Sequence, residues 1–187
     1  FNVISKSGGT AETVSQLLIA LDVLKKQLGA AKLKKHVVVT MSPHSKKSTP
    51  SPLQVLQKRY SLPVFHIPLN VGGRFSIFTP VGLFPAAMMG MDVDGLIKGC
   101  HLMDRRCSKG TLEENPAYLR AAVHYLLCQD KSKAMSVMLP YSDKLKDVSD
   151  WYCQLWAESI GKIVPATKDK PAHSVGQTPI KALGVTD

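Results

Sequence analysis

Hydrophobic side chains in the first third of the chain follow a helical spacing and then a strand-like one. Leucines recur at steps of three and four residues from Val14 to Leu28, which predicts a helix that ends at Gly29. The run from His36 to Met41 is rich in β-branched residues, as expected of a strand buried on both faces. Ser51-Pro52 has the cap residue and the first-turn proline of a new helix.

The same alternation continues along the rest of the chain. Strands are predicted at residues 1–4, 64–67 and 135–139, helices at 52–60, 76–89, 116–129 and 142–160, and a polar loop at 165–177. Buried strands that alternate with helices favour an α/β fold with a parallel sheet. A polar and acidic stretch at residues 109–114 predicts a domain boundary near residue 112.

Composition narrows the class of protein. The chain has 187 residues and is 44% hydrophobic, which supports a real core and excludes wholesale disorder. A bilayer span needs roughly 18–20 apolar residues, but the best run, Ile77 to Met91, is shorter and contains two prolines. The four cysteines form no CxxC pair, which favours reduced thiols in a cytosolic protein. We therefore expect a cytoplasmic protein with no membrane partner.

Positive charge is concentrated in the first third of the chain. Lys and Arg number 24 against 14 Asp and Glu, a net charge of +10 that first suggests nucleic acid or another anion as partner. No aromatic residues are interleaved with these cations, so a stacking platform for single strands is not indicated. We expect a solvated lysine-rich face and no nucleic-acid partner. The basic residues of this third are Lys6, Lys25, Lys26, Lys32, Lys34, Lys35, Lys46, Lys47, Lys58 and Arg59.

The segment Ser5-Lys6-Ser7-Gly8-Gly9-Thr10 joins the first predicted strand to the first helix. Its hydroxyls, its ammonium group and the free N–H groups of a helix N-terminus make a suitable anion site, and phosphate is the usual ligand there. A polar turn with a helix cap is an equally open interpretation of the pattern. Because the P-loop pattern GxxxxGK[ST] is absent, a phosphomonoester suits this loop better than a nucleotide.

Two other motifs are candidates for chemistry. Gly72-Gly73-Arg74 combines close backbone approach with a permanent charge, although alone it is more simply a turn with a surface arginine. Gln154 and Glu158 share a helix face. Their apolar neighbours predict a largely buried stretch, where a carboxylate has a raised pKa that suits a general base. Locally, an amphipathic helix with an exposed Glu158 is the commoner case.

Together these motifs resemble the glucose-6-phosphate isomerase family. The matching segments lie in family order and are spread over the chain, which looks like a central fragment of the family's longer sequence. They are ISKSGGTAET (Ile4–Thr13), NVGGRFSIFTPVGLFPAA (Asn70–Ala87), NPAYL (Asn115–Leu119), PYSDKLKDVSDWYCQLWAESIGK (Pro140–Lys162) and VGQTPIKALGVTD (Val175–Asp187).

The resemblance implies parts of two sugar-isomerase (SIS) domains, each a three-layer α/β/α sandwich with a parallel sheet. Residues 1–112 would end the first domain and residues 113–187 would begin the second. The implied activity is the reversible isomerisation of glucose 6-phosphate and fructose 6-phosphate through a cis-enediolate, in glycolysis and gluconeogenesis. It would use no metal or organic cofactor and would belong to a homodimer. Use of mannose 6-phosphate stays open.

The resemblance also implies roles for residues. Glu158 would move the proton between C2 and C1, and Arg74 would stabilise the enediolate charge. Glu12 would lie near a histidine used in ring opening. The implied substrate-binding residues are Ser5, Lys6, Ser7, Gly8, Gly9, Thr10, Glu12, Gly73 and Gln154.

Some features depart from the family pattern. Gly9 stands where the family often has a hydroxyl residue, so a backbone N–H would make one phosphate contact there. After the segment that matches Ala182–Asp187, the family continues to a Gln-His pair, and near its end it has a lysine. We therefore expect this polypeptide alone to be inactive or nearly so. The alternative is a non-catalytic sugar-phosphate-binding module, which would need the phosphate loop but neither Glu158 nor Arg74.

Overall fold

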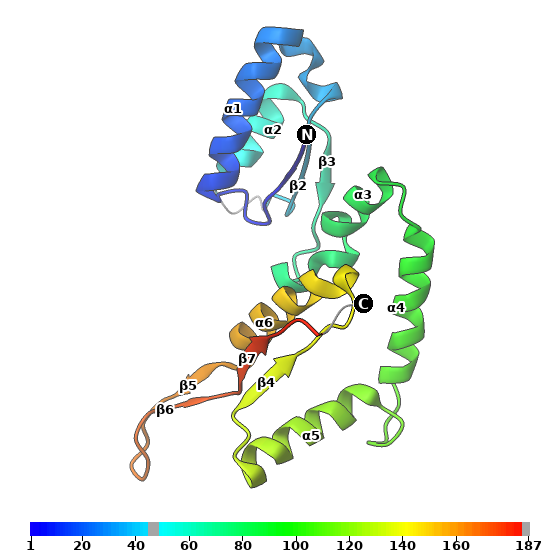
Figure 1. The fold of residues 1–187 in the computed structure, drawn as a ribbon. Coiled ribbons are helices and arrows are strands. Elements are labelled where there is room, and N and C mark those ends of the chain that lie inside the picture. The colour runs from blue at the N-terminus through cyan, green and yellow to red at the C-terminus, as the bar shows by residue number, and fades with distance from the viewer. Residues whose placement is uncertain (45–48, 185–187) are drawn as a thin grey trace. The chain divides into compact units, whose positions relative to one another are not determined.

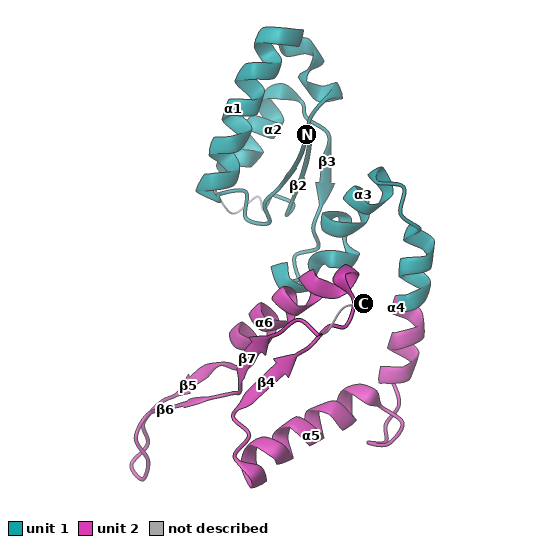
Figure 2. Ribbon diagram, viewed as in Figure 1, with its two compact units in different colours: residues 1–99 teal, residues 100–187 magenta. Residues whose placement is uncertain are grey.

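A computed structural model of the chain describes residues 1–44 and 49–184. The described residues form two compact units, residues 1–99 and 100–187 (Figure 2). Each unit combines helices with a pair or ladder of parallel strands, which confirms the α/β class. The boundary between the units falls within helix α4 (Val93–Cys107). The domain division at residues 112 and 113 stays a prediction.

Unit 1 is built on a parallel sheet in which strand β2 lies between β1 and β3 (Figure 1). Right-handed crossovers between strands that follow one another in this order place both connecting helices on the same face of the sheet. Leucines of those helices meet alternate strand residues there and form the core. The elements are β1 (Asn2–Ile4), α1 (Ala11–Leu28), the 3₁₀ helix η1 (Ala30–Lys35), β2 (Val38–Met41), α2 (Pro52–Tyr60) and β3 (Val64–His66).

The first two predicted helices of this unit are confirmed as α1 and α2, and the predicted strand at 36–41 is two residues shorter. Gly29 ends α1, because it adopts a positive φ of 81° and its N–H donates to the carbonyl of Lys25. Ser51 caps α2 in a reciprocal box: its N–H donates to Gln54 Oε1 at 2.8 Å, and its hydroxyl accepts the Gln54 N–H. The capping residues in the sequence therefore predict these helix ends correctly.

The helix predicted at residues 76–89 is wrong as a single element. The structure has a 3₁₀ helix η2 (Gly73–Phe78) followed by helix α3 (Pro80–Met88). Thr79 is extended and its hydroxyl accepts the N–H of Val81, so it caps α3. A residue before proline is disfavoured in the helical region, and Thr79-Pro80 is therefore a helix start within the apolar run.

Unit 2 holds two separate strand pairs. β4 and β7 are parallel, whereas β5 and β6 form an antiparallel pair. The loop predicted at residues 165–177 is partly wrong, because the segment contains β6. The helix predicted from residue 142 begins as a 3₁₀ turn. The elements are α5 (Pro116–Lys131), β4 (Met135–Met138), η3 (Asp143–Leu145), α6 (Lys146–Ile160), β5 (Lys162–Val164), β6 (His173–Val175) and β7 (Thr178–Lys181).

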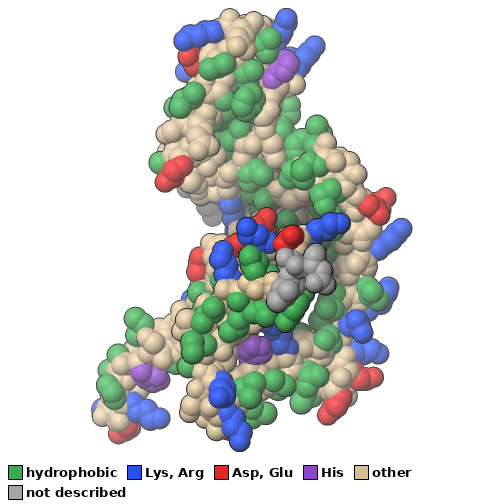
Figure 3. Space-filling view, viewed as in Figure 1, with side chains coloured by type: hydrophobic (Ala, Val, Ile, Leu, Met, Phe, Trp, Pro, Cys, Tyr) green, Lys and Arg blue, Asp and Glu red, His purple; other side chains and the backbone are tan. Residues whose placement is uncertain are grey.

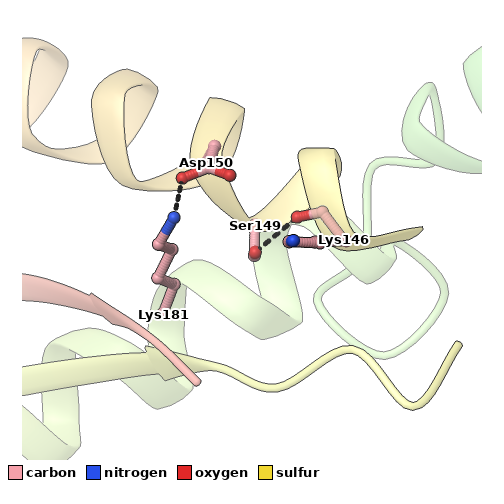
Figure 4. A network of polar contacts seen from close by, with 4 residues as sticks. All are labelled: Lys146, Ser149, Asp150 and Lys181. Carbon is pink, nitrogen blue, oxygen red and sulfur yellow. Dashed lines mark hydrogen bonds and ion pairs between the residues drawn. The ribbon is translucent and has the colours of Figure 1, made fainter. Parts of the chain in front are cut away.

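An ion pair joins α6 to β7, and a hydrogen bond lies within the first turn of α6 (Figure 4). Lys181 of β7 donates to the Asp150 carboxylate, and the Ser149 hydroxyl donates to the carbonyl of Lys146 at 2.6 Å. The hydrogen bond and negative charge of Asp150 raise the pKa of Lys181. Both partners are about half exposed, so solvent screens this ion pair. The pair therefore contributes little to the stability of the contact between α6 and β7.

Asn115 joins the end of α4 to the start of α5. Its side chain is fully buried; its amide donates to the carbonyls of Cys107 and Lys109, and its Oδ1 accepts the N–H groups of Ala117 and Tyr118. We expect Asn115→Ala to lower the free energy of unfolding of unit 2 by about 2 kcal/mol, since the cap and two buried partners are lost.

Urea unfolding followed by tryptophan fluorescence measures this effect, because both tryptophans of the chain, Trp151 and Trp156, lie on α6. Asn115→Asp is the matched control, since it keeps the acceptor at the helix start but lacks the amide donor. It should be no more stable than Asn115→Ala, because its second carboxylate oxygen would face the carbonyls of Cys107 and Lys109. An alanine variant as stable as the original chain would contradict the prediction.

The lysine-rich face of unit 1 is solvated as predicted. Figure 3 shows blue side chains at the top of the view, where α1 ends and η1 follows. The exposed lysines there are Lys25, Lys26, Lys32, Lys34 and Lys35. Two further predicted members of this face, Lys46 and Lys47, lie outside the described residues. Residues 185–187, which end the last segment that matches the family, lie outside them too.

Over the described ranges, no helix has both the length and the apolar character needed to cross a membrane.

Candidate active site

The loop of residues 5–10 runs from the end of β1 into α1 and is ordered by its own hydroxyl groups. The hydroxyls of Ser5 and Thr10 are 3.0 Å apart, and the N–H of Gly8 donates to Ser5 Oγ at 3.1 Å. Thr10 is the N-cap of α1, yet in the described structure its side chain makes no capping bond to that helix. The first N–H groups of α1 thus receive no hydrogen bond from the Thr10 hydroxyl, and phosphate binding at this helix start stays a prediction.

A pocket of about 510 Å³ opens beside this loop and is lined by Lys6, Ser7 and Thr10. It lies where β1 and β2 end, and ligands of open α/β sheets bind at the carboxyl ends of the strands. No acidic side chain lines it among the described residues, so Lys6 gives it a positive charge. Its other lining residues are Ser42, Pro43, Thr49, Ser51, Gln54 and Leu69.

Sequence reasoning missed these further lining residues. Ser42 follows β2 directly, and its buried hydroxyl has no hydrogen-bond partner among the described residues. Ser51 and Gln54 come from the first turn of α2, whose cap was recognised in the sequence only as a structural signal. The position of Ser42 after a buried strand was the one clue to a site residue, because parallel strands end at the same edge of a sheet.

Gly8 lets the loop of residues 5–10 and α2 approach each other closely. Its carbonyl accepts the N–H of Leu53 at 3.0 Å, and its φ of +70° is in the left-handed region. A Cβ atom at this position would lie 2.3 Å from Ser51 Oγ. By contrast, a Cβ on Gly9 would meet only Ser7 Oγ, at 4.0 Å. The first of the two glycines is therefore required by packing and the second is not.

The Gly72-Gly73-Arg74 segment begins η2 in the same unit. Gly72 has an ordinary φ of −67°, and a Cβ on Gly73 would meet nothing within 4 Å. The described fold therefore does not demand glycine at position 73, which leaves room for a ligand to approach the backbone. The Ser76 hydroxyl donates to the Gly73 carbonyl at 2.6 Å and fixes the turn from which half-buried Arg74 extends.

The pair Gln154 and Glu158 is exposed in unit 2, where Gln154 Nε2 donates to Glu158 Oε1 at 3.0 Å. The expected burial of this stretch is wrong for the described residues: Trp151 is 44% exposed and Ile160 is 38% exposed. Two positions along a helix correspond to about 200° of rotation, so Gln154 lies opposite Tyr152, whose side chain is buried against the strands. The role of Glu158 as a base stays a prediction.

The remaining predicted residue, Glu12, is exposed in the first turn of α1, close in sequence to the loop of residues 5–10. The predicted site residues thus fall into two groups. Residues 5–12 and the Gly73-Arg74 turn belong to unit 1, and the Gln154–Glu158 pair belongs to unit 2. In the ranges that the structure describes, no three His, Cys, Asp or Glu side chains gather as a metal site would require.

Comparisons with known proteins agree on one family. The sequence model of the family Phosphoglucose isomerase matches residues 1–184. The chain is 49% identical over its full length to the glucose-6-phosphate isomerase of Carboxydothermus hydrogenoformans, covering 38% of that protein. It is 36% identical to the probable glucose-6-phosphate isomerase of Methanococcus maripaludis over 98% of this chain, covering 37% of that relative.

A solved structure is similar as well. The hypothetical protein TT0462 from Thermus thermophilus superposes with a TM-score of 0.79 at 37% identity, over 98% of this chain and 40% of that one. The chain thus spans about two fifths of the length of the proteins it matches. The motifs singled out in the sequence, the α/β fold and the family match over nearly every residue lead to one conclusion: this chain belongs to the phosphoglucose isomerase family.

Proposed function

We propose that this chain forms the phosphate-binding and proton-transfer part of a glucose-6-phosphate isomerase. The observation that carries the proposal is the positively charged pocket beside residues 5–10, in a chain of this family. Hydroxyl and N–H donors around one ammonium group suit a phosphate monoester. Ser42, which directly follows β2, lines the same pocket.

In the proposed reaction, Glu158 takes the proton from C2 of the open-chain aldose and returns it to C1, while a second proton passes from O2 to O1. A carboxylate within reach of a proton α to a carbonyl is a competent general base. The intermediate is a cis-enediolate, and the guanidinium of Arg74 stabilises its negative charge. Ser5, Ser7 and Thr10 would hold the phosphate, and Gln154 would orient Glu158 through their hydrogen bond.

The wider setting belongs to the same proposal. We place the reaction in glycolysis and gluconeogenesis, in the cytoplasm, and the protein in a homodimer of SIS-type domains. The support for these statements is the family membership, together with relatives named glucose-6-phosphate isomerase.

The test combines this chain with a relative of known name. In a chimaera, the chain replaces the matching 187-residue segment of the C. hydrogenoformans glucose-6-phosphate isomerase. We expect the chimaera to convert fructose 6-phosphate to glucose 6-phosphate, measured by coupled oxidation of the product. The 187-residue chain alone should show no turnover above background, although it should bind inorganic phosphate.

The intact relative is the positive control, and circular dichroism checks that the chimaera is folded. A folded chimaera that binds fructose 6-phosphate but does not turn it over would contradict the isomerase proposal and favour a sugar-phosphate-binding module. Turnover by the 187-residue chain at the rate of the intact relative would contradict the expectation that this polypeptide is inactive alone.

A further inference from the structure

The ammonium group of Lys6 contacts the backbone of another motif of the site. Its Nζ donates to the carbonyl of Val71 at 2.7 Å, across 65 positions of sequence, and both residues are half-buried. Val71 directly precedes Gly72-Gly73-Arg74. The lysine of the phosphate loop thus reaches the segment that carries the arginine, and both lie in unit 1.

Three consecutive carbonyls at this turn, those of Val71, Gly72 and Gly73, each have their own donor. Lys6 Nζ binds the carbonyl of Val71, the N–H of Phe75 donates to that of Gly72 at 3.0 Å, and the hydroxyl of Ser76 donates to that of Gly73 at 2.6 Å. The second and third bonds are internal to the turn and to η2. The bond from Lys6 is the one of these three that ties the turn to another element.

The composition of the turn makes this bond important. Gly72 and Gly73 have no side chains to pack, and both are exposed, so hydrogen bonds must hold their backbone in place. A hydrogen bond from a charged donor is roughly twice as strong as one between neutral groups. An ammonium group has three protons, so one can bind Val71 while the group still contributes its charge to the pocket that Lys6 lines.

We propose that Lys6 is a positioning residue, whose ammonium group fixes the Gly72-Gly73-Arg74 backbone to the phosphate loop and thereby sets the location of the Arg74 guanidinium. The inference rests on the proposed function and extends it. The site's phosphate loop then has a second task, which is to place the charge that stabilises the enediolate. Replacing Lys6 impairs the chemical step more than substrate binding.

The first arm of the test uses the 187-residue chain and needs no activity. Hydrogen exchange of the Phe75 amide reports the turn, because that N–H is bonded to Gly72. We expect Lys6→Met to accelerate this exchange about 10-fold or more, as loss of one charge-assisted bond predicts. Lys6→Arg keeps a donor and should stay within about threefold of the original chain. Lys25→Met, on exposed α1, removes the same charge elsewhere and should have no effect.

The second arm uses the chimaera. We expect Lys6→Met to lower kcat about 10- to 100-fold and, because its charge is also lost from the pocket, to raise KM for fructose 6-phosphate by a smaller factor. In a chimaera that already carries Arg74→Met, adding Lys6→Met should lower kcat less than about threefold further. A residue that acts through Arg74 has nothing left to position there. Lys6→Gln, with a shorter and neutral donor, should give an intermediate kcat.

The outcomes separate the possible roles. Unchanged exchange of the Phe75 amide in folded Lys6→Met overturns the proposal, and so does a rise in KM with unchanged kcat, which would assign Lys6 to the phosphate alone. Additive effects with Arg74→Met also overturn it. If Lys6→Met does not fold, Lys6→Gln decides the first arm by the same criterion. An inactive chimaera rejects the proposed isomerase function, whereas the exchange measurement still decides whether Lys6 holds the turn.

Discussion

Glu158→Gln in the chimaera is expected to lower kcat about 10³- to 10⁴-fold, which is the upper part of the contribution of a general base. The amide is almost isosteric with the carboxylate but does not accept the C2 proton at neutral pH. The hydrogen bond with Gln154 can be kept, since the amide oxygen still accepts from Gln154 Nε2. KM should therefore change little, and the loss should appear in the chemical step.

The control is Asp150→Asn on the same helix. It also replaces a carboxylate by an amide, but at a residue that pairs with Lys181. It should leave kcat within about threefold of the unmodified chimaera, because an exposed ion pair adds little to stability. A second readout is the exchange of the substrate C2 proton with solvent deuterium, which should stop in Glu158→Gln. Retention of a tenth or more of kcat by that variant would assign the base to another residue.

Gly8→Ala is expected to destabilise unit 1 by about 3 kcal/mol. About 1 kcal/mol or more comes from placing a residue with a Cβ at a positive φ, and the rest comes from overpacking against α2. The nearest atom, Ser51 Oγ, would lie at 2.3 Å and belongs to the cap of that helix, so a shift of the serine would disturb the capping box. Circular dichroism during urea unfolding of the 187-residue chain measures the change.

Gly9→Ala is the matched control in the same loop. Its new methyl group would find open space, so the free energy of unfolding should stay within about 0.5 kcal/mol of the original. Inorganic phosphate should bind Gly9→Ala as it binds the original chain, but should bind Gly8→Ala more weakly. Equal stability of the two alanine variants would contradict the packing argument.

The sequence predicts helices best where local capping chemistry determines their ends. Gly29, Ser51 and Asn115 each act on the nearest turn of backbone, so the pattern of single residues is sufficient. It fails where two signals overlap. Thr79-Pro80 lies inside a continuous apolar run, and the hydrophobic pattern concealed the new helix start. It also fails for β6, which is short and exposed and has no alternating pattern.

The candidate site is predicted from the sequence only in part, for a related reason. Residues 5–10 are contiguous and act through their local turn, so their pattern predicts an anion site directly. Ser42 and Gln54 join the pocket through the sheet and through α2, and only the position of Ser42 directly after a buried strand indicates this in the sequence. The expected burial of Glu158 relied on neighbours along the sequence, whereas burial depends on which face of α6 meets the strands.

The contact between Gly8 and the first turn of α2 has a consequence for protein engineering. The loop's conformation depends on the N–H of Leu53 and on the space left by Ser51, so the proposed anion site would be a composite of two chain segments. Transplanting residues 5–10 alone into another α/β scaffold should give a loop without its binding geometry. The smallest transferable module includes the first turn of α2, and natural sequences should vary at positions 8 and 51 together.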